Sequence, residues 1–141
     1  MKTLALIFCC CLPLKHLHLN SAYGNRVHPI TRQNMFHNGI DLKARNDTVY
    51  AIAAGTSTIS YHPILGIYIK ITDGHFSHTY GHLSFLLIGN GQVSEGMPIA
   101  ITGSTGRVTS EHLHLSVSYD GRPIDPLKFL YQITIKSNNH E

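Results

Sequence analysis

No cysteine follows Cys11, and all three cysteines of the chain stand side by side at positions 9 to 11. A disulfide framework needs cysteines distributed through the folded domain, and a thiolate zinc site needs them there as ligands. Both are therefore excluded for the part of the chain that follows Pro13. A zinc ion in that part would depend on histidine and carboxylate ligands.

Charged residues and tryptophan are also scarce. Asp, Glu, Lys and Arg together make up 13% of the 141 residues, Trp is absent, and 43% of the residues are hydrophobic. This composition differs from that of a disordered chain and suffices for one domain with a hydrophobic core. The basic residues are scattered and the formal net charge is only +3, so a nucleic-acid partner is not indicated. Histidine, with eleven residues, favours a metal or proton-transfer site.

Long hydrophobic runs are missing except for Leu4 to Leu14, which follows Met1 and Lys2. A short basic start and an apolar run are typical of a secretory signal, and the run is short for a membrane span. We expect residues 1–14 to be a signal peptide or an N-terminal segment in contact with the membrane, which directs the chain to the cell envelope, either the periplasm or the exterior. The alternative is a buried first strand.

The rest of the chain has the pattern of an all-β domain, which we place at residues 15–132, with a C-terminal tail at 133–141. Short β-branched and apolar runs alternate with Gly, Asn, Asp and Pro. The one helical turn is expected at Ile124 to Tyr131, after Pro123. Strands are expected at Leu17 to Asn20, Gly39 to Lys43, Thr48 to Ala51, Thr56 to Tyr61, Gly66 to Thr72, His78 to His82, Met97 to Ile101 and His112 to Tyr119.

His37 and Asp41 form the first candidate pair of ligands, with Gly39 midway between them. In an extended chain these positions share one face, while Ile40 and Leu42 face the core. A flat strand would separate the two side chains by about 13 Å, too far to share an ion bound at about 2 Å. The chain must therefore bend near Gly39. On its own this spacing is common, and an ordinary exposed turn is the alternative.

A second pair, His112 and His114, alternates with Leu113 and Leu115. In a strand both imidazoles project from one face, about 6.6 Å apart along the chain. One ring can then bind a metal while the other reaches the metal's water or the substrate. The alternative is a pair of histidines facing solvent.

His82 is the third candidate, in the segment from Tyr80 to Ser84. His78 and His82 have the spacing of a helical zinc pair, but Gly81 and the β-rich surroundings disfavour a helix, and no H-E-x-x-H motif is present. We therefore interpret His82 as a site residue and His75 and His78 as surface histidines.

Taken together and in this order, these motifs resemble the lysostaphin/LytM-type peptidoglycan endopeptidases over about Pro13 to Tyr131. The resemblance implies a mainly β fold, a two-layer antiparallel β sandwich with a groove, of the duplicated hybrid motif type with very little helix. It also implies one Zn²⁺ ion held by His37, Asp41 and His114, with His82 and His112 as catalytic residues. The segments that carry it are Ser21 to Ile30, His37 to Asp41, Tyr80 to Ser84, Gly103 to Gly106, Glu111 to His114 and Ile124 to Pro126.

Three protein ligands leave a fourth zinc position for water, which is typical of a catalytic site. The sequence thus predicts a zinc metalloendopeptidase that hydrolyses stem or bridge peptides of bacterial peptidoglycan. Two alternatives are a catalytically silent module that binds the wall or activates another hydrolase, and a domain in which zinc is only structural.

Overall fold

The computed structural model describes residues 12–139, so nearly all of the predicted signal or membrane segment lies outside the described residues. All strand pairs are antiparallel, and one helix is present among the described residues, which confirms a mainly β fold with very little helix. The elements are β1 (Leu19–Ser21), β2 (Gly24–Val27), β3 (Asn34–His37), β4 (Ile40–Lys43), β5 (Thr48–Tyr50), β6 (Gly55–His62), β7 (Gly66–Asp73), β8 (Phe76–Leu86), β9 (Gly91–Val93), β10 (Pro98–Thr102), β11 (His112–Tyr119), β12 (Arg122–Ile124) and α1 (Pro126–Asn138).

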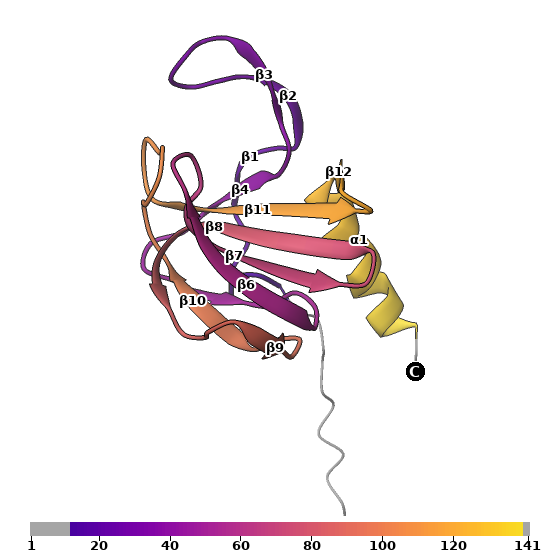
Figure 1. Ribbon diagram of the computed structural model, residues 1–141. Helices are drawn as coiled ribbons and strands as arrows, with labels where there is room; N and C mark the ends of the chain where they lie inside the picture. The colour runs from indigo at the N-terminus through magenta and orange to yellow at the C-terminus, as the bar shows by residue number, and fades with distance from the viewer. Residues whose placement is uncertain (1–11, 140–141) are drawn as a thin grey trace, which may run out of the picture.

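One large sheet forms the body of the molecule, with strand order β1-β4-β11-β8-β7-β6-β9 (Figure 1). The long strand β8 pairs with β7 along one side, and on its other side its first part pairs with β11 and its last part pairs with β10, which in turn pairs with β5. β11 lies between β4 and β8, and its register places His114 opposite both Asp41 and Gly81. Three of the predicted functional segments are therefore neighbours in the middle of the sheet.

The hydrophobic core lies on one face of these central strands, and the histidines of the predicted site lie on the other face. Alternation along β11 buries Leu113 and Leu115 completely, and β4 does the same with Ile40 and Leu42. The side chain of Tyr80 joins the core, where its hydroxyl oxygen accepts a hydrogen bond from the backbone N–H of Ile52 at 2.9 Å. A rigid, fully packed face thus supports the histidines that project from the other side.

The hairpin of β2 and β3 was not expected from the sequence. It projects from the body of the sheet (Figure 1), and its strands hold residues such as Asn25, Arg26 and Asn34 that have low strand propensity. Its connecting loop is fixed by His28, whose Nδ1 accepts hydrogen bonds from the backbone N–H groups of Ile30 and Thr31, both at 3.2 Å. Local turn chemistry rather than hydrophobic alternation defines this element.

The helix begins later and runs further than Ile124 to Tyr131. Ile124 belongs to β12, and Asp125 caps the helix by accepting a hydrogen bond from the N–H of Leu127 at 3.0 Å, with a proline in the first turn. Helix α1 continues to Asn138, into the segment assigned to a tail. Leu130 is buried, and Ile133 in the added part packs partly against the core, so contact with the sheet stabilises the longer helix.

His78 is not a surface histidine. Only 1% of the residue is exposed, and neither ring nitrogen makes a hydrogen bond within the described part of the chain. The ring lies between Tyr80 and Phe129, with ring centroids 6.5 and 6.3 Å away. Because burial removes water from the ring, the pKa of His78 falls to about 4. The sequence pattern could not show this, because the helix that covers the ring follows 48 residues later.

His78 should make the fold sensitive to acid. Above pH 6.5 the ring is neutral in both states, but between pH 6.5 and about 4 only the unfolded chain takes up the proton, so folding stability falls as pH falls. We expect His78→Phe to be more stable than the native protein, with an advantage about 2–3 kcal/mol larger at pH 4.5 than at pH 7.5. Urea unfolding at both pH values measures this, with His16→Phe at an exposed position as control. An advantage that does not widen would contradict the burial argument.

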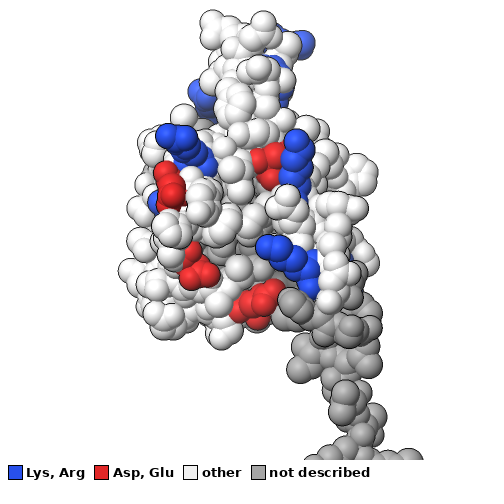
Figure 2. Space-filling view, turned by 90° about the vertical axis from the view of Figure 1, so that its right-hand side faces the viewer, with Lys and Arg blue, Asp and Glu red and all other residues white. Residues whose placement is uncertain are grey.

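The surface facing the viewer in Figure 2 carries basic and acidic side chains close to one another. The part of the chain described, residues 12–139, contains no helix that is long and apolar enough to cross a membrane.

Candidate metal centre

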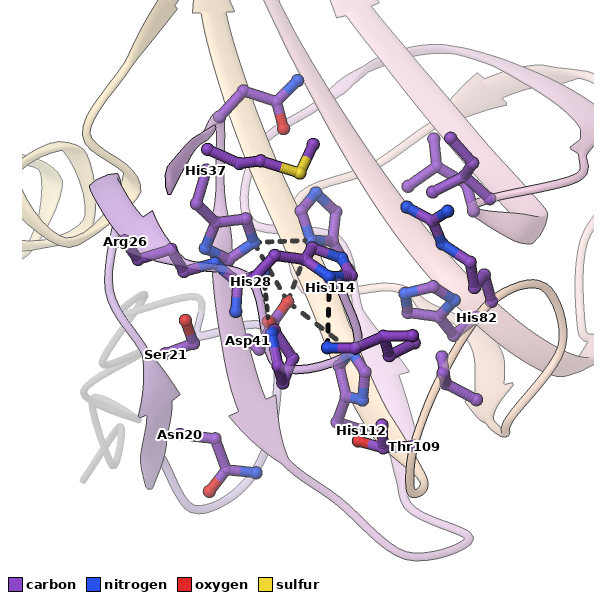
Figure 3. Close-up of a pocket in the computed structure, with 18 of the residues that line it drawn as sticks. Asn20, Ser21, Arg26, His28, His37, Asp41, His82, Thr109, His112 and His114 are labelled. Carbon is purple, nitrogen blue, oxygen red and sulfur yellow. Dashed lines mark hydrogen bonds and ion pairs between the residues drawn. The ribbon is translucent and has the colours of Figure 1, made fainter. Parts of the chain in front are cut away.

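Three buried side chains point at one another in the middle of the sheet (Figure 3). The Nε2 atom of His37 lies 3.3 Å from Asp41 Oδ1 and 3.3 Å from His114 Nδ1. The third side of this triangle, from His114 Nδ1 to Asp41 Oδ1, is 2.9 Å. The exposed fractions of the three residues are 9% or less. The structure therefore brings the three predicted ligands together.

This donor set fits a tetrahedral metal ion. Ligand atoms about 2.0–2.1 Å from a tetrahedral zinc ion lie about 3.3 Å from one another, close to the three separations given above. The Nδ1–H group of His37 donates to the backbone carbonyl of Ala22 at 2.9 Å, which leaves the Nε2 lone pair facing the centre. Two imidazoles and one carboxylate can thus act as three protein ligands of a single ion.

A break between β3 and β4 creates the required bend. β3 ends at His37 and β4 begins at Ile40, so the chain turns at Asn38 and Gly39 and returns Asp41 toward His37. Gly39 also lets the chain approach β11 closely, because a Cβ atom there would lie 2.8 Å from the Nε2 atom of His114 and 2.5 Å from the carbonyl oxygen of Leu115. The bend predicted from the spacing of the two ligands is present.

Gly39→Ala should disturb the centre without touching a ligand. The carbonyl of Leu115 belongs to a paired strand and cannot move away, so the added methyl group must displace the ring of His114 or the β4 backbone. We expect a loss of stability of about 1–3 kcal/mol together with weaker metal binding. Thermal unfolding and zinc titration measure both effects. Gly89→Ala is the matched control, since nothing lies within 4 Å of a Cβ at that position, and equal effects in both variants would refute the packing argument.

His112 and His82 lie beside the three ligands. The Nε2 atom of His112 is 3.5 Å from Asp41 Oδ1, and the rings of His82 and His112 meet edge to face with centroids 4.6 Å apart. The Nδ1–H of each ring donates to a backbone carbonyl, that of Ser110 at 2.9 Å for His112 and that of Thr105 at 2.8 Å for His82. Since a carbonyl only accepts, each ring keeps an unprotonated Nε2 in its neutral form.

An irregularity in β8 turns His82 into the site. The pairing with β7 shifts between Ile69 opposite Tyr80 and Ile67 opposite Leu83, and His82 has a left-handed φ of 61°. Tyr80 and Leu83 are therefore both fully buried in the core while His82 faces the other way. A regular strand would place Leu83 on the opposite face from Tyr80. Strain of this kind is held in place by surrounding contacts.

The loop from Gly103 to Gly106 supplies those contacts. The Thr105 hydroxyl donates to the Leu83 carbonyl at 2.6 Å and accepts from the Ile67 N–H at 3.1 Å, so one side chain bridges the irregular part of β8 to β7. Gly106 has a φ of 81° and approaches Gly66 so closely that no side chain fits between them. This loop thus fixes both the backbone and the ring of His82.

Burial and hydrogen bonding set the charges of the centre. Burial by itself raises the pKa of the Asp41 carboxyl, but its interactions with the rings of His114 and His37 outweigh burial and hold that pKa far below its usual range. Burial lowers the pKa of His114 and lowers that of His82 to about 4. At neutral pH the centre therefore contains an ionised carboxylate and neutral His82 and His114, the forms that bind metal and accept protons.

The centre opens into a groove of about 730 Å³ between the β2–β3 hairpin and the loop of residues 103–111. Two positively charged residues that line the groove, Arg26 and Arg107, were not among the predicted site residues, and the Nη2 atom of Arg26 lies 3.6 Å from Asp41 Oδ2. His28 and His62 also line the groove, and His62 is the last residue of β6. Arg26 lies within Ser21 to Ile30, one of the segments on which the family resemblance rests, but its residue type and spacing alone do not indicate contact with Asp41.

The model of peptidase family M23 matches residues 35–126. This chain belongs to peptidase family M23. Among curated proteins, it is 40% identical over 107 residues to the peptidoglycan DD-endopeptidase ShyA of Vibrio cholerae serotype O1, which covers 73% of this chain and 25% of the relative. The M23 chain thus spans about a quarter of the length of that relative.

Solved structures show the same fold. A zinc containing peptidase from Vibrio cholerae superposes with a TM-score of 0.74 and 33% identity, over 80% of this chain and 37% of the other. The catalytic domain of lysostaphin from Staphylococcus simulans superposes with a TM-score of 0.71 and 26% identity, over 82% of this chain and 92% of the other. The predicted resemblance to the lysostaphin/LytM-type family is confirmed, and the M23 match includes all five predicted site residues.

Proposed function

We propose that this M23 chain is a zinc-dependent endopeptidase that hydrolyses peptide cross-links of bacterial peptidoglycan in the cell envelope. The observation that carries the proposal is the convergence of three buried donors at 2.9–3.3 Å with two further histidines beside them. A solely structural zinc site has four protein ligands, and it does not need two additional rings whose Nε2 atoms are free to accept a proton. The named activity of ShyA agrees with this assignment.

We assign metal binding to His37, Asp41 and His114 and catalytic roles to His112 and His82. A zinc ion held by these three residues would supply a water molecule of lowered pKa and a Lewis acid for the scissile carbonyl. The unprotonated Nε2 of His112 lies 3.5 Å from Asp41 Oδ1. It accepts a proton from the attacking water and passes it to the nitrogen of the leaving amine. His82, neutral because burial lowers its pKa to about 4, accepts a hydrogen bond at Nε2 and orients the reacting groups.

A catalytically silent module is not favoured, because all five positions keep side chains able to perform these roles. The direct test is to incubate the zinc-loaded protein with purified peptidoglycan and to identify released fragments by mass spectrometry. We expect new amino and carboxyl ends at peptide bonds, which a chelator suppresses and added zinc restores. A protein that binds zinc but releases no peptide ends at neutral pH would overturn the proposed activity.

A further inference from the structure

Outside the metal centre, the charges of the groove are all positive. Among the described residues that line it, Asp41 is the only acidic one, and its carboxylate is already engaged by His37 and His114. The permanently charged residues that remain are Arg26 and Arg107. A peptide lying in this groove therefore meets more positive than negative charge, which favours a substrate that carries negative charge.

Arg107 is the cation available to a substrate. The guanidinium of Arg26 is partly compensated, since its Nη2 lies 3.6 Å from Asp41 Oδ2. Arg107 is exposed, and within residues 12–139 it forms no ion pair. Its backbone N–H donates to the carbonyl of Ile64 at 2.9 Å, so the loop is held in place while the side chain is left for a ligand.

The two arginines act on the same part of the groove from different sides. Loss of hydration lowers the pKa of His28, which also lines the groove, and the positive charges of Arg107 and Arg26 lower it further. Both arginines therefore lie near this ring. Figure 3 shows Arg26 and His82 on opposite sides of the metal centre. The carbonyl of Thr105 accepts the hydrogen bond from His82. Because Arg107 follows Thr105 by two residues, its backbone lies on the same side of the centre as His82.

We propose that Arg107 forms a subsite for a carboxylate that the substrate carries next to the scissile amide. A guanidinium binds a carboxylate through two parallel hydrogen bonds, which fixes the orientation as well as the charge. The inference rests on the proposed amide hydrolysis. It names the substrate class as peptides in which the carbon attached to the amide nitrogen also bears a free carboxylate, as in D,D cross-links. An internal glycine bridge has no carboxylate at that place.

The test compares two peptides that differ only in this group. One is a cross-linked stem-peptide dimer with the free carboxylate beside the scissile amide, and the other has the same carboxylate converted to a primary amide. Two further peptides complete the set. A linear stem peptide ending in D-Ala-D-Ala carries its carboxylate at the chain end, and pentaglycine carries none beside an internal amide. We expect the native enzyme to prefer the carboxylate dimer over its amide by about 10- to 100-fold in kcat/KM.

Variants at Arg107 should change this preference mainly through KM. Arg107→Met is expected to bring the ratio of carboxylate to amide substrate close to one, and Arg107→Lys to restore part of it. Arg122→Met, an exposed arginine on β12 outside the groove, is the matched control and should keep the native ratio. If the native enzyme cleaves the linear peptide faster than the dimer, the subsite binds the carboxylate of a chain end, which would contradict the proposed cross-link substrate.

Binding separates this proposal from the proposed activity. Calorimetric titration of the zinc-loaded native protein and of Arg107→Met with the same two dimers gives the discrimination even if no bond is cut. If the native protein binds the carboxylate dimer more tightly than its amide but cleaves neither, the proposed activity is wrong and the carboxylate subsite stands. Equal affinity and equal cleavage of the two dimers, or an equal loss on both in Arg107→Met, would overturn the carboxylate subsite.

Discussion

Asp41→Asn is expected to lower zinc affinity at least about 100-fold and to abolish detectable hydrolysis at low zinc concentration. Loss of an outer-shell partner of a metal ligand costs about 10- to 100-fold in affinity, and loss of the ligand charge itself costs more. The carboxylate is buried, ionised and within 3.3 Å of both histidine ligands, so its charge offsets that of a cation. Zinc titration with a competing chelator, together with fragment release, measures the two effects.

The fold should survive this change. Asn is close to Asp in shape, and the backbone pairing of Asp41 with His114 does not depend on the side chain. Asp120→Asn, at an exposed carboxylate that pairs with His75, is the matched control and should retain both zinc and activity. Full zinc occupancy in Asp41→Asn would contradict the assignment of this residue as a ligand.

His112→Ala and His82→Ala should each reduce kcat by about 10²- to 10⁴-fold while zinc stays bound. Both rings present an unprotonated Nε2 toward the centre, and neither belongs to the triangle of closest donors. Single-turnover rates on a cross-linked dimer, measured at one zinc per chain, isolate the chemical step. His62→Ala, which lines the same groove, should change kcat little. Activity losses that follow zinc loss in either variant would contradict the proposed division of roles.

The central sheet was predictable because its strands carry simple patterns. Leu113 and Leu115 alternate with histidines in β11, and both leucines are fully buried. The bend at Gly39 was also predictable, because His37 and Asp41 lie too far apart in a flat strand to bind the same ion. These features are local in the sequence, so a single chain is enough to infer them.

Features that depend on distant segments were not predictable. The rotation of His82 into the site comes from a shifted register against β7 and from Thr105, 23 residues away. His78 is buried because α1 covers it, and Arg26 reaches Asp41 only because the β2–β3 hairpin brings β2 beside the centre. In each case tertiary contacts override the local pattern.

The most direct test of this account is a crystal structure of the zinc-bound protein with the metal located by anomalous scattering. We expect one zinc ion per chain, bound by His37, Asp41 and His114, with a fourth position that faces the groove and holds no protein side chain. A fourth protein ligand at that position, for instance His112, or a zinc ion bound elsewhere, would contradict the proposed hydrolase.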